Sequence, residues 1–209
     1  MDENGYYVIT ADIIGSRQQA EAPRRAERGL EKINAHYCAA LAAEFTRYRG
    51  DELQGALHDS ADLIRLLRHL RYALLGLPLR IGVGWGEISS GLERRYAWQM
   101  DGSAFHRSRA ALEQIKNRRE AATCFLGDGE KIWDMLNAFY GLIDTIESRW
   151  SLKQWEAIDV YERAGTYAAA SRELQITPQN VAKRCRAAAW KTVEGTERYL
   201  AACLKKAVL

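Results

Sequence analysis

The sequence predicts an α+β fold: a ferredoxin-like α/β sandwich followed by a small all-α helix-turn-helix domain. Over residues 1–129, strand-like and helix-like segments alternate in a βα, ββ, αβ order, which is typical of helices covering a mostly antiparallel sheet. Over residues 151–209, short amphipathic helical segments follow one another with tight turns between them. We therefore expect one domain at 1–129, a connecting helix at 130–150, and a second domain at 151–209.

The first half of the sandwich is predicted from its apolar runs. Residues 6–12 read as a strand, and residues 24–44 have the period of a helix. A hairpin over residues 45–57 is expected to turn at Gly50 and Asp51, because glycine and aspartate favour turns. The apolar face of the predicted helix consists of Leu30, Ile33, Tyr37 and Leu41.

The second half continues with two helices and a strand. Ser60 is a suitable N-cap for a helix whose inward face repeats leucine. Pro78 precedes a predicted strand over Leu79–Val83, and a further helix is expected over 102–119. The inward leucines are Leu63, Leu67, Leu70 and Leu74.

Apolar residues in the connecting segment recur at spacings of four and three, which predicts a helix with a heptad seam. Such a helix either packs on its own domain or dimerises and links the two domains, and the pattern leaves both alternatives open. The seam residues are Ile132, Leu136, Phe139, Ile143, Ile146 and Trp150.

Three helix starts are predicted in the C-terminal domain. Ser151 and Gln154 have the spacing of a capping box, Thr166 can cap a helix over 167–174, and Thr177 followed by proline can cap a third. The second and third helices form a helix-turn-helix in outline, and the third presents polar and basic side chains. For DNA contact we expect Gln179, Asn180, Lys183 and Arg184 at base edges, with Arg186 and Lys191 at phosphates.

Composition limits the classes of function. The net charge of +3 is uneven: residues 1–149 carry −1 and residues 150–209 carry +4, with no acid over 177–191. This asymmetry favours a polyanionic partner, although a solvated basic helix face gives the same pattern. No apolar stretch is long enough to span a membrane, no signal peptide is expected, and the four scattered cysteines have no metal-ligand spacing. We therefore expect a cytoplasmic protein without a membrane partner.

Two carboxylates stand at the ends of predicted strands. Asp12 closes the first strand and Asp51 lies in the hairpin turn, each near a glycine that frees backbone groups. Paired carboxylates at one sheet edge can hold Mg²⁺ or Mn²⁺ together with nucleotide phosphates. Alternatively, both residues simply cap their turns, which is a common role of aspartate.

The segments around these carboxylates resemble known families. ADIIGS (11–16), RGD (49–51) and LRIGVGWGE (79–87) resemble motifs of class III nucleotidyl cyclases, and RYRGDEL (47–53) resembles the diguanylate cyclase signature loop; both families share a palm-like core. ADIIGSR (11–17), GDELQG (50–55) and DGSAFHRSR (101–109) together resemble the SatD family. The cyclase resemblance implies metal binding by Asp12 and Asp51. It implies nucleotide binding by Ile13, Gly15, Ser16, Arg47, Gly50 and Gln99.

The last cyclase motif is altered. Anchored on Gly102, the positions of the base-recognising residue, the asparagine and the arginine hold Gln99, His106 and Ala110. A shift of one residue recovers Arg109 but loses the asparagine position. His106 and Arg109 are thus candidates for rebuilt catalytic partners, although His106 reads equally well as a surface histidine.

The C-terminal segment resembles the helix-turn-helix of region 4 of bacterial sigma factors. Together these features predict a DNA-binding transcriptional regulator with a nucleotide- and metal-binding, cyclase-like sensor domain. The alternative is an active nucleotidyl cyclase or nucleotidyltransferase that acts on NTPs, and a third possibility is a module that docks on RNA polymerase. Because cyclase-type domains pair across their site, the resemblance implies a homodimer.

Overall fold

A computed structural model of the chain describes residues 5–16, 19–48, 50–120 and 122–207. The chain divides into two compact units, Met1–Gly141 with Leu200–Leu209 and Leu142–Tyr199. The boundaries fall inside two helices, α4 (Glu130–Glu147) and α8 (Trp190–Ala207). In the part of the chain that is described, none of the helices combines the length and the apolarity needed to cross a bilayer.

The first unit is built on a five-stranded sheet with the strand order β2-β3-β1-β4-β5. The pairs β2–β3, β3–β1 and β1–β4 are antiparallel, and β5 pairs with β4 in parallel at one edge of the sheet. A βαββαβ chain with this strand order is the ferredoxin-like arrangement, so the predicted fold class is confirmed. The strands are β1 (Tyr6–Ile13), β2 (Leu41–Tyr48), β3 (Glu52–Leu57), β4 (Leu79–Gly86) and β5 (Ala122–Leu126).

One face of the sheet is covered by α3 (Ser103–Ile115). Its Ser108 hydroxyl shares a 2.9 Å hydrogen bond with Thr10 of β1. Two glycines of β4 allow the helix to lie this close, because a Cβ at Gly82 or Gly84 would sit 2.2 Å from a backbone atom of α3. Successive side chains of a strand point to opposite faces, so the even-numbered residues of β1 and β4 face α3.

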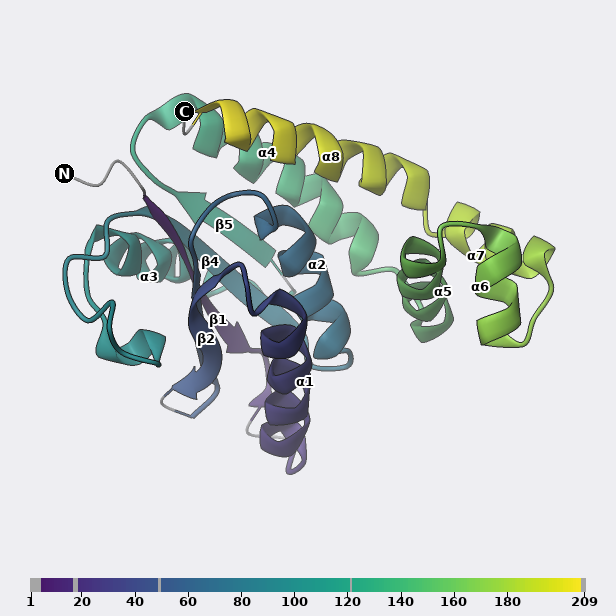
Figure 1. Ribbon diagram of the computed structural model, residues 1–209, viewed down its shortest axis with the longest axis horizontal. Helices are drawn as coiled ribbons and strands as arrows, with labels where there is room; N and C mark the ends of the chain where they lie inside the picture. The colour runs from purple at the N-terminus through teal and green to yellow at the C-terminus, as the bar shows by residue number, and fades with distance from the viewer. Residues whose placement is uncertain (1–4, 17–18, 49, 121, 208–209) are drawn as a thin grey trace. The chain divides into compact units, whose positions relative to one another are not determined.

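The other face is covered by α1 (Ala22–Tyr37), α2 (Leu63–Ala73) and the first half of α4. Figure 1 shows α1 and α2 side by side. They touch at Gly29, where a Cβ would lie 2.7 Å from the Ala73 carbonyl oxygen. On this face Tyr7 of β1 contacts Trp133 of α4, with 6.5 Å between the ring centroids. One part of the apolar core therefore lies between the sheet and these three helices, and a second part lies beneath α3.

The helix predicted over residues 24–44 is wrong at its C-terminal end. It ends at Tyr37, and the chain enters β2 at Leu41. Residues 38–44 are rich in alanine and match a helical period, but pairing of β2 with β3 overrides that local preference. The strand β5, the extension of β4 to Gly86 and the ending of α3 at Ile115 were also not predicted.

The heptad seam is only partly the buried face of α4. Leu136 and Ile143 are buried as expected. Ile132, Phe139 and Ile146 are partly exposed, and other residues of the helix are buried in their stead. The additional buried apolar residues are Trp133 and Tyr140, and Tyr140 packs on Phe125 of β5 with 4.7 Å between centroids. The first half of α4 thus packs on its own sheet, which is one of the two alternatives. Dimerisation through the helix stays a prediction.

The second unit is helical. Its helices α5 (Leu152–Ala164), α6 (Tyr167–Leu174) and α7 (Pro178–Ala187) begin at the predicted caps. Ser151 and Gln154 form the capping box, and the Thr166 and Thr177 hydroxyls accept hydrogen bonds from Ala169 and Asn180 backbone N–H groups. The aromatic core gathers Trp150, Trp155 and Trp190.

Candidate functional site

The two predicted carboxylate segments meet at one end of the sheet. The Ile13 backbone N–H at the end of β1 donates to the Asp51 carbonyl oxygen over 3.2 Å. The Ser16 hydroxyl then donates to an Asp51 carboxylate oxygen over 2.8 Å. Gly15 and Gly50 both have positive φ, of 69° and 85°, in the left-handed region where glycine is favoured. Two tight turns are thereby bonded to each other.

These turns border a cavity of about 320 Å³, a volume at the lower end of the range for small-molecule sites. The first residues of α1 close it on the other side. The two α1 residues that line it offer no free N–H, because Pro23 has none and the Ala22 N–H donates to the Gln19 carbonyl oxygen, so this end of α1 favours an anion through the helix dipole. The lining residues are Ile13, Ser16, Ala22, Pro23, Arg47, Gly50 and Asp51, and thus include five residues that the sequence nominated for nucleotide or metal binding.

Arg47 supplies the positive side chain of this cavity. Its Nη1 lies 3.3 Å from Glu27 of α1, and its side chain is 27% exposed. Its Nε is buried and has no hydrogen-bond partner among the described residues. A buried N–H without a partner costs free energy, but no solvent reaches this Nε, so the part of Arg47 that can meet a ligand in the cavity is its more exposed guanidinium end.

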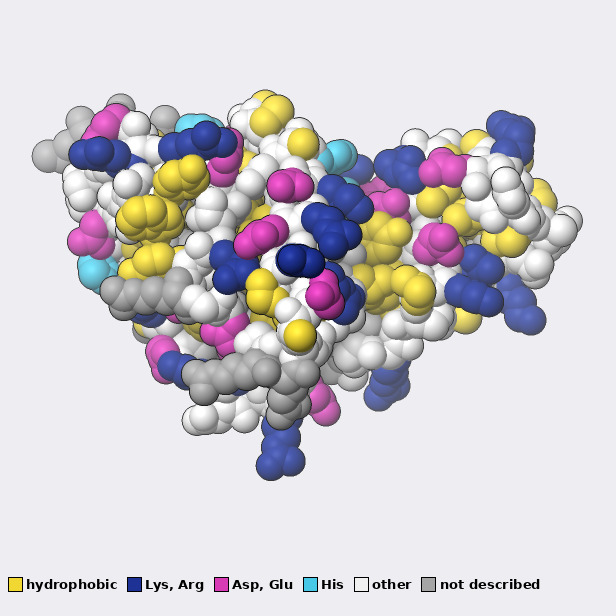
Figure 2. Space-filling model, turned by 90° about the horizontal axis from the view of Figure 1, so that it is seen from below, with side chains coloured by type: hydrophobic (Ala, Val, Ile, Leu, Met, Phe, Trp, Pro, Cys, Tyr) yellow, Lys and Arg dark blue, Asp and Glu magenta, His cyan; other side chains and the backbone are white. Residues whose placement is uncertain are grey.

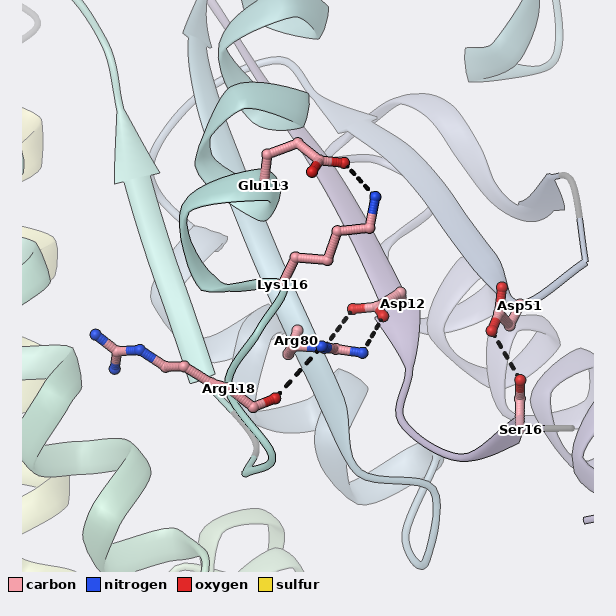
Figure 3. Close-up of polar contacts among 7 residues, drawn as sticks. All are labelled: Asp12, Ser16, Asp51, Arg80, Glu113, Lys116 and Arg118. Atoms are coloured by element: carbon pink, nitrogen blue, oxygen red, sulfur yellow. Dashed lines mark hydrogen bonds and ion pairs between the residues drawn. The ribbon is translucent and has the colours of Figure 1, made fainter. Parts of the chain in front are cut away.

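Asp12 has a different environment. Both of its carboxylate oxygens accept hydrogen bonds from Arg80 of β4, over 3.0 Å from Nε and 2.6 Å from Nη2. Arg80 also donates to the Arg118 carbonyl oxygen. Burial raises the pKa of the Asp12 carboxyl, while the Arg80 guanidinium opposes that rise. Figure 3 shows Asp12 pointing toward Arg80 and Asp51 pointing toward Ser16.

The sheet geometry explains why the two carboxylates do not converge. Ile13 lines the cavity, and its neighbour Asp12 must project to the opposite face, the face covered by α3. There Asp12 stands directly across from Glu52 of β3. Arg109 of α3 donates to Glu52 over 2.8 Å. The structure thus pairs Arg109 with Glu52, a carboxylate that the sequence analysis did not single out.

A metal ion bridged by Asp12 and Asp51 does not fit this arrangement. Among the described residues, no group of three or more His, Cys, Asp or Glu side chains could hold a metal ion. Arg80 occupies both oxygens of Asp12, and a guanidinium is a competing cation. Of the two aspartates only Asp51 lines the cavity, and among the described residues it accepts a side-chain hydrogen bond from Ser16, on one carboxylate oxygen. A cation at this site would rely on Asp51 and on oxygens of a ligand.

Two predicted residues do not line the cavity. His106 is exposed at the start of α3, where its Nε2 is 3.3 Å from Asp101. The start of α3 packs beside Gly86. Gly86 is six residues along β4 from Arg80, which separates the two positions by roughly 20 Å at the usual rise of a strand. Gln99 is exposed in the short helix η2 (Ala97–Gln99), on the loop between β4 and α3. Neither joins the cavity within one chain.

The predicted DNA contacts lie on α7 and just after it. Gln179, Asn180, Lys183, Arg186 and Lys191 are exposed, while Val181 and Cys185 anchor the opposite side of α7 in the core. Arg184 differs, because it is half-buried and its Nη1 lies 3.9 Å from Glu156 of α5. A basic, acid-free helix face is therefore present, with Arg184 at its margin.

Sequence reasoning missed Arg80 and Glu52. Arg80 precedes the glycines of β4 at even spacing, so it belongs to the face that meets α3, and Glu52 follows Asp51 directly. Alternation along the strands could have placed both on the face of Asp12. Their pairing with Asp12 and Arg109 depends on strand register, which the sequence did not supply.

A comparison of the sequence with protein-family profiles gives a match. The profile described as the SatD family matches residues 6–201. No curated protein matches the chain significantly.

Similar solved structures include a bacterial light-regulated adenylyl cyclase, with 15% identity and a TM-score of 0.41 over 58% of this chain and 75% of that chain. The guanylyl cyclase Cya2 has 14% identity and a TM-score of 0.36 over 53% of this chain and 70% of that chain. A regulator of polyketide synthase expression from Bifidobacterium adolescentis has 12% identity and a TM-score of 0.26 over 97% of this chain and 80% of that chain. The fold assignment rests on the strand order of the sheet itself.

Proposed function

The chain belongs to the SatD family, and we propose that it is a DNA-binding regulator whose first unit binds a nucleotide by its phosphates. The observation that carries the nucleotide part is the cavity beside the two turns. Residues from two separate segments, both nominated by a cyclase-like motif pattern, line this one space together with the start of α1. A structural role for the aspartates alone would not require Arg47 and the start of α1 to face the same cavity.

The chemistry of the cavity suits a phosphate group. Arg47 offers the positive charge of its guanidinium, and the N-terminus of α1 offers a partial positive charge. Ser16 can donate its hydroxyl hydrogen either to Asp51 or to a ligand oxygen. Asp51 would repel a phosphate, unless a divalent cation lies between them. Mg²⁺ or Mn²⁺ arriving with the nucleotide would supply that neutralisation, with Asp51 as its protein ligand.

We propose that the first unit binds a nucleotide without converting it to a product. Asp12 is held by Arg80, and His106 lies at the far end of α3. Among the described residues of one chain, His106 and Gln99, which the cyclase resemblance nominated for the altered motif, do not line the cavity. The first unit is therefore proposed to be a sensor for a nucleotide.

The experiment is a calorimetric titration of the full chain with ATP, GTP and inorganic pyrophosphate, with and without Mg²⁺. Arg47→Ala is expected to weaken binding about ten-fold or more, because a charge-assisted hydrogen bond is lost. The exposed Arg119→Ala serves as a matched loss of one positive charge and should leave affinity unchanged. No binding of any of the three ligands would refute the nucleotide part. Turnover of an NTP with Mn²⁺ that Asp12→Ala and Asp51→Ala abolish would overturn the sensor interpretation in favour of an active cyclase.

DNA binding is proposed from the second unit. The helices α6 and α7 are joined by a three-residue connection, and α7 starts at a Thr177 cap with Gln179 and Asn180 exposed in its first turn. In helix-turn-helix proteins the first residues of the second helix read base edges. Lys183, Arg186 and Lys191 extend the basic face for phosphates.

This part is tested by fluorescence anisotropy with duplex DNA at several salt concentrations. Lys183→Ala and Arg186→Ala should each weaken binding. Each should also reduce the steepness of log affinity against log salt concentration by roughly one, the value for one phosphate contact. Lys153→Ala removes an exposed lysine of α5, outside the proposed face, and should have little effect. Unchanged affinity in both α7 variants would remove α7 as the DNA-contacting helix.

A further inference from the structure

Three aromatic side chains form a row at the outer edge of the sheet. Trp98 of η2 is nearly parallel to Tyr48 of β2 and to Tyr96, with an interplanar angle of 9° in both pairs. The centroid separations are 6.2 Å and 6.1 Å, within the range of offset stacking. Trp98 is common to both pairs and is 45% exposed, although it is large and apolar. We call Tyr48, Trp98 and Tyr96 the aromatic row.

The row is held in place by the backbone around it. Tyr96 makes a parallel β-bridge with Glu44 of β2, and the next residue, Ala97, is fully buried in the core beneath α3. Gly91 approaches this segment so closely that a Cβ there would lie 2.6 Å from the Gln99 carbonyl oxygen. A loop anchored on both sides presents Trp98 in a fixed orientation.

Polar groups border the row. The Arg95 guanidinium lies 5.5 Å from the Tyr96 ring centroid and pairs with Glu44 over 3.1 Å. Gln99, next to Trp98, is exposed and brings an amide with both donor and acceptor groups. Figure 2 shows hydrophobic side chains reaching the surface at the left of the view, bordered by Lys, Arg, Asp and Glu side chains. Flat aromatic surface beside an amide suits a planar, hydrogen-bonding ring better than it suits an aliphatic ligand.

The row also lies near the cavity described above. Tyr48 directly follows Arg47 and is two residues before Gly50, both of which line that cavity. Consecutive Cα atoms are ~3.8 Å apart, so the Tyr48 and Gly50 Cα atoms are at most about 7.6 Å apart. Arg47 pairs with Leu53 and Tyr48 with Glu52, so their side chains leave β2 on opposite faces of its edge. Both positions are therefore at the same end of an edge strand.

We propose that the aromatic row is a stacking platform for the base of the nucleotide, with Trp98 as the principal contact, beside Gln99, the residue that the cyclase resemblance already nominates for the base edge. The ligand then straddles the edge of β2, with its base on the aromatic row and its phosphates at Arg47. This proposal rests on the proposed nucleotide binding. Stacking of a base on an aromatic side chain tolerates any base, so selection among bases falls to Gln99.

The test uses calorimetric titrations of the full chain with ATP, GTP and inorganic pyrophosphate. Trp98→Ala is expected to weaken the binding of the better nucleotide roughly ten-fold, in line with the loss of one stacked base, and to leave pyrophosphate affinity unchanged. Trp98→Phe, which keeps a ring, should restore most of the affinity. Gln99→Ala should reduce the ratio between the ATP and GTP affinities.

Leu92→Ala is the matched control, because Leu92 is equally exposed, at 45%, on the same loop. It should change neither nucleotide nor pyrophosphate binding. Nucleotide affinity unchanged in Trp98→Ala would overturn the platform while leaving the phosphate site intact. Equal weakening of nucleotide and pyrophosphate by Trp98→Ala would also overturn it, since a base platform does not touch pyrophosphate. Failure of the wild-type chain to bind any of the three ligands would instead refute the proposed function.

Discussion

Asn34 of α1 forms two hydrogen bonds with the backbone of Phe45 in β2. The Phe45 N–H donates to the Asn34 Oδ1 over 2.8 Å, and the Asn34 Nδ2 donates to the Phe45 carbonyl oxygen over 2.9 Å. At the opposite edge of the sheet, Asn137 of α4 makes the same pair of bonds with Phe125 of β5, at 2.7 Å and 3.0 Å. Each edge strand is thus capped by an asparagine amide that takes the place of a neighbouring strand.

The asparagine caps predict a cost in stability when they are removed. Asn34→Ala leaves a donor and an acceptor of Phe45 without their partner, and we expect a loss of about 1–3 kcal/mol in the free energy of unfolding. Asn137→Ala should behave alike. Urea denaturation measures both, with the exposed Asn117→Ala as the control that should change stability by less than about 0.5 kcal/mol. Equal stability of all three variants would show that water replaces the amide at both edges.

The Asp12–Arg80 pair predicts a pH dependence. Burial raises the pKa of the Asp12 carboxyl, so between the ordinary and the raised pKa the folded chain binds more protons than the unfolded chain. The contribution of Asp12 to stability therefore falls as pH rises through that window. Arg80→Gln removes the cation that opposes the rise, so the pKa of Asp12 should increase further and the fall should extend to higher pH.

At pH 7 we expect Arg80→Gln to cost about 2 kcal/mol, because a mostly buried carboxylate loses its partner. Urea denaturation between pH 4 and pH 7 measures this cost, and Arg119→Gln controls for the loss of an exposed charge. A stability curve for Arg80→Gln that runs parallel to that of the wild type would contradict the assigned role of Arg80.

The cysteines predict selective alkylation. Cys185 is 2% exposed, and burial raises its pKa to about 11, so at pH 8 only about one thiol in a thousand is ionised. Cys38 is exposed. Iodoacetamide should therefore label Cys38 in the folded chain and label Cys185 only after denaturation, as read by mass spectrometry of peptides. Comparable labelling rates in the folded chain would mean that the second unit opens readily around α7.

Two left-handed positions in the second unit predict substitutions of opposite sign. Gly165 after α5 has φ 74° and Gln175 after α6 has φ 54°. Gly165→Ala should destabilise the unit by about 1 kcal/mol, because a Cβ is unfavourable in this region. Gln175→Gly removes that strain at the cost of extra freedom in the unfolded chain, so we expect a gain of about 0.5 kcal/mol. Urea denaturation followed by circular dichroism measures both, and the same sign for the two would contradict the assigned conformations.

Local signals in the sequence were sufficient for the helices of the second unit. The caps at Ser151, Thr166 and Thr177 act over three residues, so the chain itself determines where α5, α6 and α7 begin. The fold class followed in the same way, because the order of strand-like and helix-like segments already restricts the sheet to few topologies. Residues 38–44 show the limit: their alanines match a helical period, yet 38–40 form a turn and 41–44 join a strand through pairing of β2 with β3.

For the candidate site, too, the sequence determined one part and the tertiary structure another. Motifs in the sequence brought Asp12, Asp51 and Ser16 to attention, and β1 and the β2–β3 turn do meet at one end of the sheet. Only the tertiary structure decides that Asp12 faces α3 and Arg80, whereas Asp51 faces the cavity and Ser16. The physical reason is that the pleat turns successive side chains to opposite faces, while register between distant strands selects the partner each side chain meets there.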